Sequence, residues 1–354
     1  MTDTHVTSGS GLAGVPLALT PLNRKDVVSD AEVRWCPGCG DYAVLATFQG
    51  VLPELGIARE NTVIVSGIGC SSRFPYYVDT YGVHSIHGRA PAVATGLAMT
   101  RPDLAVFVVT GDGDALSIGG NHLIHALRRN LNITILLFNN RIYGLTKGQF
   151  SPTSEQGKVT KSSPMGTLAV PFNPLSLAIG AEATFVARAI DSDRAGLSEV
   201  LTAAAKHRGA SFVEIYQNCP IFNDGAYEAV KGKAAGDSII RLVHGEPVTF
   251  AGGTRGVLRD GSTGELIIVD VEEVGLDSLL VHDAHREDPS LAFALSRLTD
   301  AGELRRAPIG IFRDVERPAY DDLARQQIET AGRPEDPDAA LQALLRGAET
   351  WTVL

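Results

Sequence analysis

The amino-acid sequence predicts an α/β fold with a doubly wound, mostly parallel β-sheet. Four short segments are apolar nearly throughout and rich in β-branched residues, as strands buried on both faces of a sheet must be: Thr62–Ser66, Leu104–Val109, Ile133–Phe138 and Ser211–Tyr216. Three longer segments read as helices that precede or separate these strands: Tyr42–Leu55, Asn121–Arg129 and Leu197–His207. Alternation of strand and helix is typical of a parallel sheet covered by helices.

Composition divides the chain into three parts. Residues 1–30 are polar and rich in Gly, Ser and Thr, which favours an arm that docks late or onto a partner. Residues 31–225 contain the predicted α/β domain. Residues 226–354 form a C-terminal extension that we expect to be irregular, with glycine-rich turns, one short strand candidate at Glu265–Val271 and a weakly helical, charged tail from Arg325.

Charge and hydropathy limit the classes of function. The 354 residues include 41 acidic and 31 basic side chains, and the formal charge of −10 argues against a nucleic-acid partner. There is no uncharged apolar run long enough to span a membrane, and the N-terminus lacks the features of a signal peptide. We therefore expect a cytoplasmic protein, without a membrane partner, whose four cysteines stay reduced.

The segment from Gly111 to Asn140 gives the strongest functional signal. A GDG triplet that contains Asp112 directly follows one predicted strand, and a pair of asparagines that ends in Asn140 directly follows the next. Parallel strands joined by a right-handed crossover end at one edge of the sheet, where open α/β sheets bind their ligands. Mg²⁺ prefers hard oxygen ligands that it shares with phosphate, and glycine lets the backbone approach a diphosphate closely. The pattern predicts a site for Mg²⁺ and a diphosphate.

The four cysteines give a second signal. Cys36 and Cys39 form a CxxC pair, whereas Cys70 and Cys219 each follow a predicted strand and so share the edge of Asp112. Four thiolates can hold zinc or an iron–sulfur cluster. Structural zinc usually takes two close pairs, so the separated third and fourth cysteines favour a [4Fe–4S] cluster. Zinc, a redox-active CxxC pair and unligated buried thiols stay open as alternatives.

Several motifs together resemble the β subunit of 2-oxoacid:ferredoxin oxidoreductases over about residues 31–225. The motifs are WCPGCGD (35–41), GIGCSSRFPYY (67–77), HSIHGRAPAVATG (84–96), GDG…NN (111–140) and YQNCP (216–220). The resemblance implies thiamine diphosphate held through Mg²⁺ by Asp112, Asn140 and the carbonyl of Ile142. It also implies a [4Fe–4S] cluster on all four cysteines. Implied contacts to the cofactor come from two loops: Ile68, Gly69, Cys70, Ser71, Gly113 and Asp114, then Gly144 and Leu145 farther along.

Three residues are candidates for binding the substrate. Arg73 follows Cys70 by three positions, and a guanidinium pairs bidentately with a carboxylate, so it is suited to the distal carboxylate of 2-oxoglutarate. Lys147 is a rival for that role. His87 is a candidate for a hydrogen bond to the substrate or the diphosphate, preferred over His84 because a glycine follows it. A solvent-facing arginine and a structural histidine are the alternatives.

The resemblance implies oxidative decarboxylation of 2-oxoglutarate with coenzyme A to succinyl-CoA, CO₂ and reduced ferredoxin. An α subunit is expected to carry the pyrimidine-side domain, with the activating carboxylate, and the domains for the 2-oxoacid and coenzyme A. Catalytic residues of this chain are therefore not assigned, and electrons are expected to leave to ferredoxin. Pyruvate or branched-chain 2-oxoacids, a non-redox thiamine-diphosphate enzyme and a catalytically silent scaffold are the competing interpretations.

Overall fold

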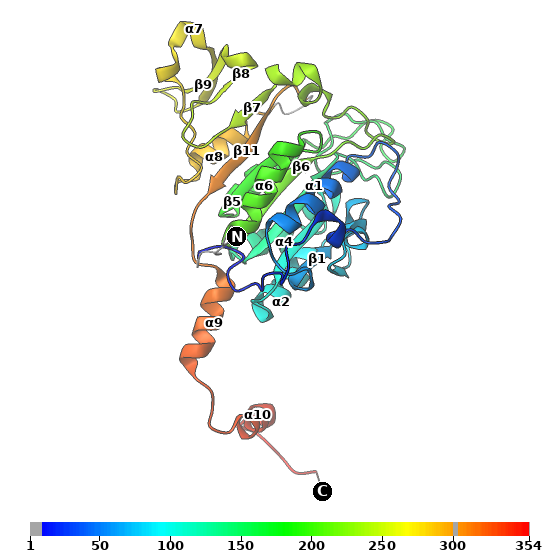
Figure 1. The fold of residues 1–354 in the computed structure, drawn as a ribbon, viewed down its shortest axis with the longest axis vertical. Coiled ribbons are helices and arrows are strands. Elements are labelled where there is room, and N and C mark those ends of the chain that lie inside the picture. The colour runs from blue at the N-terminus through cyan, green and yellow to red at the C-terminus, as the bar shows by residue number, and fades with distance from the viewer. Residues whose placement is uncertain (1–8, 300–303, 354) are drawn as a thin grey trace.

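A central eight-stranded sheet organises the chain (Figure 1). The computed structural model describes residues 9–299 and 304–353. The strand order is β2-β1-β3-β4-β6-β5-β11-β7, and all neighbours are parallel except β5 and β11. The strands of this sheet are β1 (Thr62–Ser66), β2 (Tyr81–His84), β3 (Ala105–Gly111), β4 (Ile133–Asn139), β5 (Phe185–Ile190), β6 (Ala210–Tyr216), β7 (Ile239–Leu242) and β11 (Ala307–Asp314).

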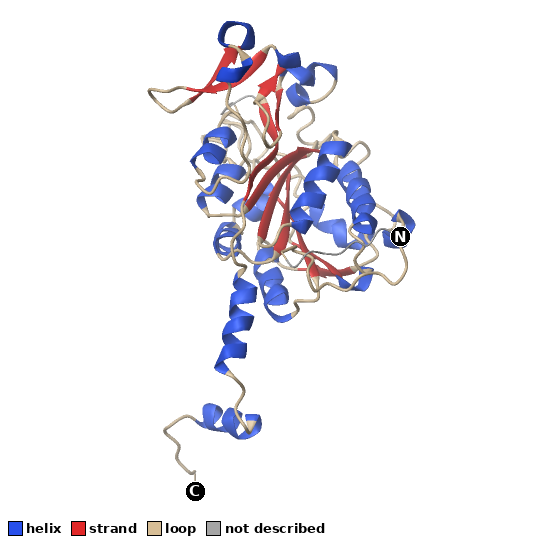
Figure 2. Ribbon diagram, turned by 60° about the vertical axis from the view of Figure 1, so that its left-hand side comes forward, coloured by secondary structure: helices blue, strands red, loops and turns tan. Residues whose placement is uncertain are grey.

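Helices cover both faces of the sheet, which confirms the predicted doubly wound fold (Figure 2). The α-helices are α1 (Asp41–Glu54), α2 (Ala90–Thr100), α3 (Asp112–Leu116), α4 (Gly120–Arg128), α5 (Pro174–Gly180), α6 (Arg194–Lys206), α7 (Val271–Val274), α8 (Ser290–Ser296), α9 (Tyr320–Ala331) and α10 (Pro337–Arg346). Among the described residues, none of these helices combines the length and apolar character required to cross a membrane. The four predicted strands and three predicted helices are present, with bounds shifted by at most three residues.

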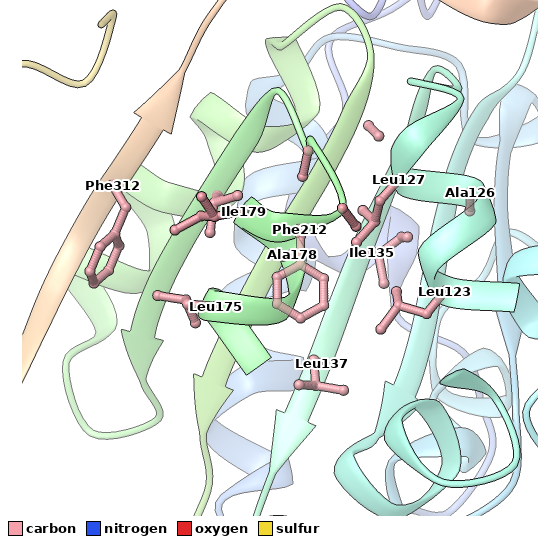
Figure 3. Close-up of a cluster of buried hydrophobic side chains, with 14 of the residues drawn as sticks. Leu123, Ala126, Leu127, Ile135, Leu137, Leu175, Ala178, Ile179, Phe212 and Phe312 are labelled. Carbon is pink, nitrogen blue, oxygen red and sulfur yellow. The ribbon is translucent and has the colours of Figure 1, made fainter. Parts of the chain in front are cut away.

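Alternate side chains of each central strand enter two separate cores. In β4, Ile135 and Leu137 pack with α2, α4 and α5, whereas Leu136 and Phe138 face the core of α1 and α6. Figure 3 shows the first core, where Phe212 of β6 lies among leucines of α4 and α5. Burial of each large side chain stabilises the fold by about 1.5–3 kcal/mol. Burial on both faces therefore accounts for the mostly apolar sequences of the central strands.

The C-terminal extension is more regular than the sequence predicts. It supplies β7 and β11 to the central sheet, and it forms an antiparallel sheet in the order β10-β9-β8. The strands of this second sheet are β8 (Thr249–Phe250), β9 (Arg255–Arg259) and β10 (Leu266–Asp270). The expectation of a single strand in residues 230–275 is wrong, because only β10 stands out as an apolar run. Helices α9 and α10 lead away from the sheet to the C-terminus (Figures 1 and 2).

The described part of the N-terminal arm packs on the domain. Leu12, Val15 and Val27 are buried in the core beneath α1 and α6, and the backbone of Gly11 donates a hydrogen bond to Lys206 O at 2.7 Å. Residues 1–8 of the predicted arm lie outside the described residues. Buried apolar residues thus attach this segment to the fold.

A buried histidine in the extension makes stability depend on pH. Nε2 of His282 lies 2.7 Å from Ile311 O, and Nδ1 is buried without a hydrogen-bond partner among the described residues. Burial lowers the pKa of His282 below 6.5; the Ile311 carbonyl opposes that shift, His244 and His285 add to it, and Asp283 opposes it. As pH falls below 6.5, His282 therefore binds a proton in the unfolded chain but not in the folded chain. The folded state loses stability relative to the unfolded state over this pH range.

We expect His282→Gln, which keeps a donor for Ile311 O, to lose less stability on acidification than the parent chain. The measurement is the melting temperature at about pH 7.5 and about pH 5.5, on either side of the ordinary histidine pKa. His125→Gln, at an exposed position of α4, is the control and should behave like the parent. An equal fall of the melting temperature on acidification in the parent and both variants would show that His282 does not contribute to the pH dependence of stability.

Candidate active site

Four adjacent parallel strands end at one edge of the sheet, and the predicted site residues follow them. Registers pair Ser66 with Val109, Gly111 with Phe138, and Asn139 with Tyr216, so β1, β3, β4 and β6 end level with one another. The segments that follow these ends are Gly67–Ser71, Asp112–Asp114, Asn140–Ile142 and Gln217–Cys219. The topology therefore brings both predicted sites to one edge.

Asp112 begins α3 directly after β3 and is almost completely buried. Its Oδ2 accepts hydrogen bonds from Ser151 Oγ at 2.5 Å and Thr153 Oγ1 at 2.6 Å. Burial raises the pKa of Asp112 to about 6, and the two hydroxyl donors limit the rise. Burial thus disfavours the charged carboxylate, and a bound cation would offset that cost.

The turn after β4 orders the second group of candidate ligands. Asn140 Oδ1 accepts from the backbone of Ile142 at 3.2 Å, and its Nδ2 donates to Gln217 Oε1 at 3.0 Å. Arg141 has a φ of +58°, which turns the chain sharply between them. Asn223 Nδ2 donates to Asn140 O at 3.0 Å and fixes this turn from a distant segment.

The turns at this edge leave no room for larger residues. A Cβ on Gly113 would lie 2.3 Å from the ring of Tyr143, whose hydroxyl donates to Gly113 O at 2.8 Å. A Cβ on Gly67 would lie 1.8 Å from Asp114 Oδ2. These contacts hold the turn after β4 over the start of α3, so Gly113 is required for packing as well as for approach to a ligand.

The oxygens at this edge fit Mg²⁺ by their chemistry. Asp112 supplies a carboxylate, Asn140 an amide oxygen and Ile142 a carbonyl, all of which are hard ligands. Over residues 9–299 and 304–353, no cluster of three or more His, Cys, Asp and Glu side chains could hold a metal ion. The three candidate oxygens include only one carboxylate, that of Asp112, so they do not form a cluster of three such side chains.

Asp114 is buried and ties α3 to the loop before α2. Its Oδ1 accepts from His87 Nδ1 at 2.5 Å and from the backbone of Gly88 at 2.7 Å, and its Oδ2 accepts from Thr110 Oγ1 at 2.7 Å. The side chain of Asp114 is therefore structural, which leaves its backbone as the possible cofactor contact. The side chain of His87 is 41% exposed, and Nδ1 is the ring nitrogen that the contact with Asp114 occupies.

The four cysteines interact with one another electrostatically. Burial, followed by the charges of Asp41, Cys219 and Cys36, raises the pKa of Cys70 to about 12. Burial is also the main cause that raises the pKa of Cys39, with Asp41, Cys219 and Cys70 adding to it. A Cβ on Gly144 would lie 3.6 Å from the sulfurs of both Cys70 and Cys219.

The CxxC segment docks against the segment that follows β6. The backbone of Gly40 donates to Asn218 O at 3.1 Å, and Gln217 Nε2 donates to Cys39 Sγ at 3.2 Å. Cys36 is exposed, whereas Cys39 is half-buried. This docking places the CxxC pair, which the strand pattern does not place, at the same edge as Cys219.

Asp41 lies beside the cysteines and was not predicted from the sequence. It is 1% exposed, and neither carboxylate oxygen has a hydrogen-bond partner in the described structure. Burial raises the pKa of Asp41 to about 7; the neighbouring side chain of Cys39 opposes the rise, and the charge of Asp191 adds to it.

The remaining predicted residues lie at the rim. Arg73 is partly exposed, donates from Nε to Tyr77 Oη at 3.1 Å, and is close enough to Cys70 to lower the pKa of that thiol slightly against its overall rise. Ile68, Leu145 and Lys147 are exposed. Lys147 has a φ of +75°, and its backbone donates to Gly144 O at 3.0 Å, so it closes a tight turn above the cysteines.

Sequence reasoning missed the polar residues that support the site. Ser151 and Thr153 belong to the loop after Asn140, and Glu214 and Arg188 lie inside strands that are otherwise apolar. The charged residues inside apolar strands were a signal in the sequence, because an ionisable side chain in a buried strand requires a hydrogen-bond or charge partner. The pairing of β5 with β6 was not predicted, however, so the partner could not be named.

Comparisons with known proteins show the family to which the chain is similar. A family profile described as "Thiamine pyrophosphate enzyme, C-terminal TPP binding domain" matches residues 67–215. The chain is 63% identical over 344 residues to the 2-oxoglutarate oxidoreductase subunit KorB of Mycobacterium tuberculosis, covering 96% of this chain and 91% of that protein. It is 47% identical to subunit beta of 2-oxoacid:ferredoxin oxidoreductase 1 of Aeropyrum pernix, over 57% of this chain and 62% of that protein.

A solved structure extends the similarity to the whole fold. The 2-oxoglutarate:ferredoxin oxidoreductase from Magnetococcus marinus, with 2-oxoglutarate, coenzyme A and succinyl-CoA bound, aligns with a TM-score of 0.74 and 33% identity. The alignment covers 95% of this chain and 100% of that chain. The sequence resemblance is thereby confirmed: the chain belongs to the family of KorB β subunits of 2-oxoglutarate oxidoreductases.

Proposed function

We propose that this chain is the thiamine-diphosphate-binding subunit of a heteromeric 2-oxoglutarate:ferredoxin oxidoreductase. The reaction converts 2-oxoglutarate, coenzyme A and two oxidised ferredoxins to succinyl-CoA, CO₂, two reduced ferredoxins and a proton. The observation that carries the proposal is the convergence of Asp112, Asn140 and the cysteines at one sheet edge, in a chain 63% identical to a KorB subunit. Its free cysteines suit the reducing cytoplasm.

Asp112, Asn140 and the carbonyl of Ile142 would hold Mg²⁺, and through it the diphosphate. The bound thiamine supplies the electron sink that allows CO₂ to leave. The protein's part is to hold the Asp112 carboxylate through Ser151 and Thr153, to leave the space beside Gly113 free of a Cβ, and to hold the Asn140 turn over α3 through Tyr143. The backbone from Ile68 to Ser71 and the exposed Leu145 would line the same space.

Cys36, Cys39, Cys70 and Cys219 would hold a [4Fe–4S] cluster. Each thiolate of such a cluster binds a different iron, so the sulfurs need to gather around a common space without converging on one ion. A Cβ on Gly144 would lie 3.6 Å from the sulfurs of both Cys70 and Cys219, and Gln217, two residues before Cys219, donates to Cys39 Sγ; both contacts support this arrangement. Because Cys36 is exposed, ferredoxin could approach the cluster from that side to accept electrons.

An α subunit would complete the active site. The described residues contain a single parallel α/β sheet, and the carboxylate that activates the pyrimidine would come from the partner. We expect the purified chain, with thiamine diphosphate, Mg²⁺, coenzyme A and ferredoxin, to show no turnover of 2-oxoglutarate. Reconstitution with the α subunit should restore turnover, and the heteromer should use 2-oxoglutarate in preference to pyruvate. Robust activity of the chain alone, or a heteromer inactive on every 2-oxoacid, would contradict the proposal.

Arg73 is the proposed partner of the distal carboxylate of 2-oxoglutarate. Its guanidinium is fixed by Tyr77 near Cys70, and part of it remains exposed at the rim. We expect Arg73→Met to lower kcat/KM for 2-oxoglutarate roughly tenfold to a hundredfold, the size of a charge-assisted hydrogen bond. Pyruvate, which lacks that carboxylate, should be affected little.

The rival residue serves as the matched control for Arg73. Lys147→Met removes an exposed cation from the neighbouring loop and should leave the ratio of the two substrates unchanged. If Lys147→Met alone shifts that ratio, the carboxylate is bound by Lys147 instead. Equal losses on both substrates in Arg73→Met would assign Arg73 a structural role.

A further inference from the structure

We propose that Glu214 and Arg188 are positioning residues of the Mg²⁺ site and act on it through Asn139. This inference depends on the proposed function, because it concerns how that site is held in shape. Asn139 is the first asparagine of the motif, and no ligand role falls to it. Its side chain is 3% exposed, so its hydrogen bonds are made within the protein.

Asn139 connects the two halves of the site. Its Oδ1 accepts from the backbone of Arg141 at 3.1 Å, which caps the turn that carries Asn140 and Ile142. The hydroxyl of Thr153 lies 2.9 Å from the same Oδ1 and 2.6 Å from Asp112 Oδ2. Since one hydroxyl proton serves one acceptor at a time, these side chains form a coupled unit.

Glu214 decides which way the amide of Asn139 points. Asn139 Nδ2 donates to Glu214 Oε1 at 2.7 Å. A carboxylate only accepts hydrogen bonds, so the amide must present its NH₂ group to Glu214. Its oxygen then faces the backbone of Arg141 and the hydroxyl of Thr153. With the amide reversed, an NH₂ group would meet the Arg141 N–H, and the turn would lose its cap.

Arg188 holds the side chain of Glu214 in place. Its Nε donates to Glu214 Oε2 at 2.7 Å, and both side chains are 1% exposed. Its Nη1 donates to Pro308 O of β11 at 3.2 Å, and the guanidinium lies 4.9 Å from the ring centroid of Tyr216. An apolar pair of similar size is often as stable as a buried ion pair, so stability alone does not account for this one.

A cavity of about 130 Å³ borders this network. Its walls include Asn139, Thr153, Arg188, Glu214 and Tyr227, whose buried hydroxyl has no hydrogen-bond partner in the described structure. The cavity has room for several water molecules. Water can therefore fill the space that a shortened side chain leaves, so variants at these positions can retain the fold.

The test uses paired variants in the reconstituted heteromer. Arg188→Met/Glu214→Leu removes both charges and the acceptor for Asn139, whereas Arg188→Met/Glu214→Gln keeps an acceptor oxygen. We expect the apparent Kd for Mg²⁺, measured by thermal shift at saturating thiamine diphosphate, to rise about 10–100-fold in the first variant, the usual effect of losing an outer-shell partner. The second variant should recover most of that affinity. At saturating Mg²⁺, kcat of both double variants should return to the parental value.

Arg313→Met is the matched control. Arg313 is also buried, on β11, and donates to the carbonyls of Ala183, Arg286 and Glu287, away from Asn139. It should lower the melting temperature without changing Mg²⁺ affinity. If the Arg188→Met/Glu214→Leu variant folds and binds Mg²⁺ as tightly as the parent, this inference is wrong, whereas the proposed function is unaffected. A parental heteromer that binds neither Mg²⁺ nor thiamine diphosphate would overturn the proposed function with it.

Discussion

Asp112→Asn in the reconstituted heteromer is expected to abolish binding of Mg²⁺ with thiamine diphosphate, and turnover with it. The substitution preserves the shape of the side chain but removes the one carboxylate among the three proposed ligands. Its loss should lower kcat/KM by at least about a hundredfold, more than the loss of an outer-shell partner. The measurement is calorimetric titration of the heteromer with thiamine diphosphate at several Mg²⁺ concentrations, followed by steady-state kinetics.

The environment of Asp112 allows that variant to fold. The side-chain hydroxyls of Ser151 and Thr153 can still donate to an amide oxygen, and the cost of burying a charge disappears. Asp103→Asn is the matched control, since Asp103 forms an exposed surface pair with Arg101 whose loss should barely change stability. Normal cofactor binding by Asp112→Asn would show that the metal is held elsewhere.

Cys219→Ser is expected to eliminate the proposed iron–sulfur cluster while leaving the cofactor site intact. The alcohol of serine does not deprotonate near neutral pH, so it replaces a thiolate poorly as an iron ligand. Under anaerobic conditions the variant should lack the broad visible absorbance of a cluster. Ferredoxin reduction should fall by at least about a hundredfold, because the loss of a ligand costs more than that of an outer-shell partner.

The internal control for Cys219→Ser is cofactor affinity. Cys219 follows β6, whereas the proposed Mg²⁺ ligands follow β3 and β4, so thiamine diphosphate should bind as tightly as in the parent. A variant that retains iron and ferredoxin reduction would exclude Cys219 as a ligand. A parent protein that contains zinc in place of iron would contradict the cluster itself.

The strands that carry the site could be predicted because burial on both faces leaves a local signal. Segments such as TVIVS and ITILLF contain only residues suited to a two-sided core, and their ends place Asp112, Asn140, Cys70 and Cys219 at one edge. In contrast, β2 has four exposed residues and β5 contains the charged Arg188. β2 therefore lacks the pattern of two-sided burial. β5 was missed although β6, which contains the charged Glu214, was predicted, so a single charge does not account for that omission.

The supporting part of the site could not be predicted because it depends on contacts between distant segments. Thr153 reaches Asp112 across 41 positions, and Arg188 reaches Pro308 across 120 positions. Strand order decides both contacts, and it follows from the complete sheet, including the antiparallel β11 from the extension. Motif spacing indicates ligands, therefore, but it does not reveal what orients them.

The most direct test follows the cluster's visible absorbance in anaerobic heteromer that contains this chain, without ferredoxin, after addition of 2-oxoglutarate and coenzyme A. If electrons pass from the cofactor site to a cluster on Cys36, Cys39, Cys70 and Cys219, the absorbance should bleach as CO₂ is released, and ferredoxin should restore it. Release of CO₂ with an unchanged spectrum would contradict the account, because the two sites would not be electronically connected.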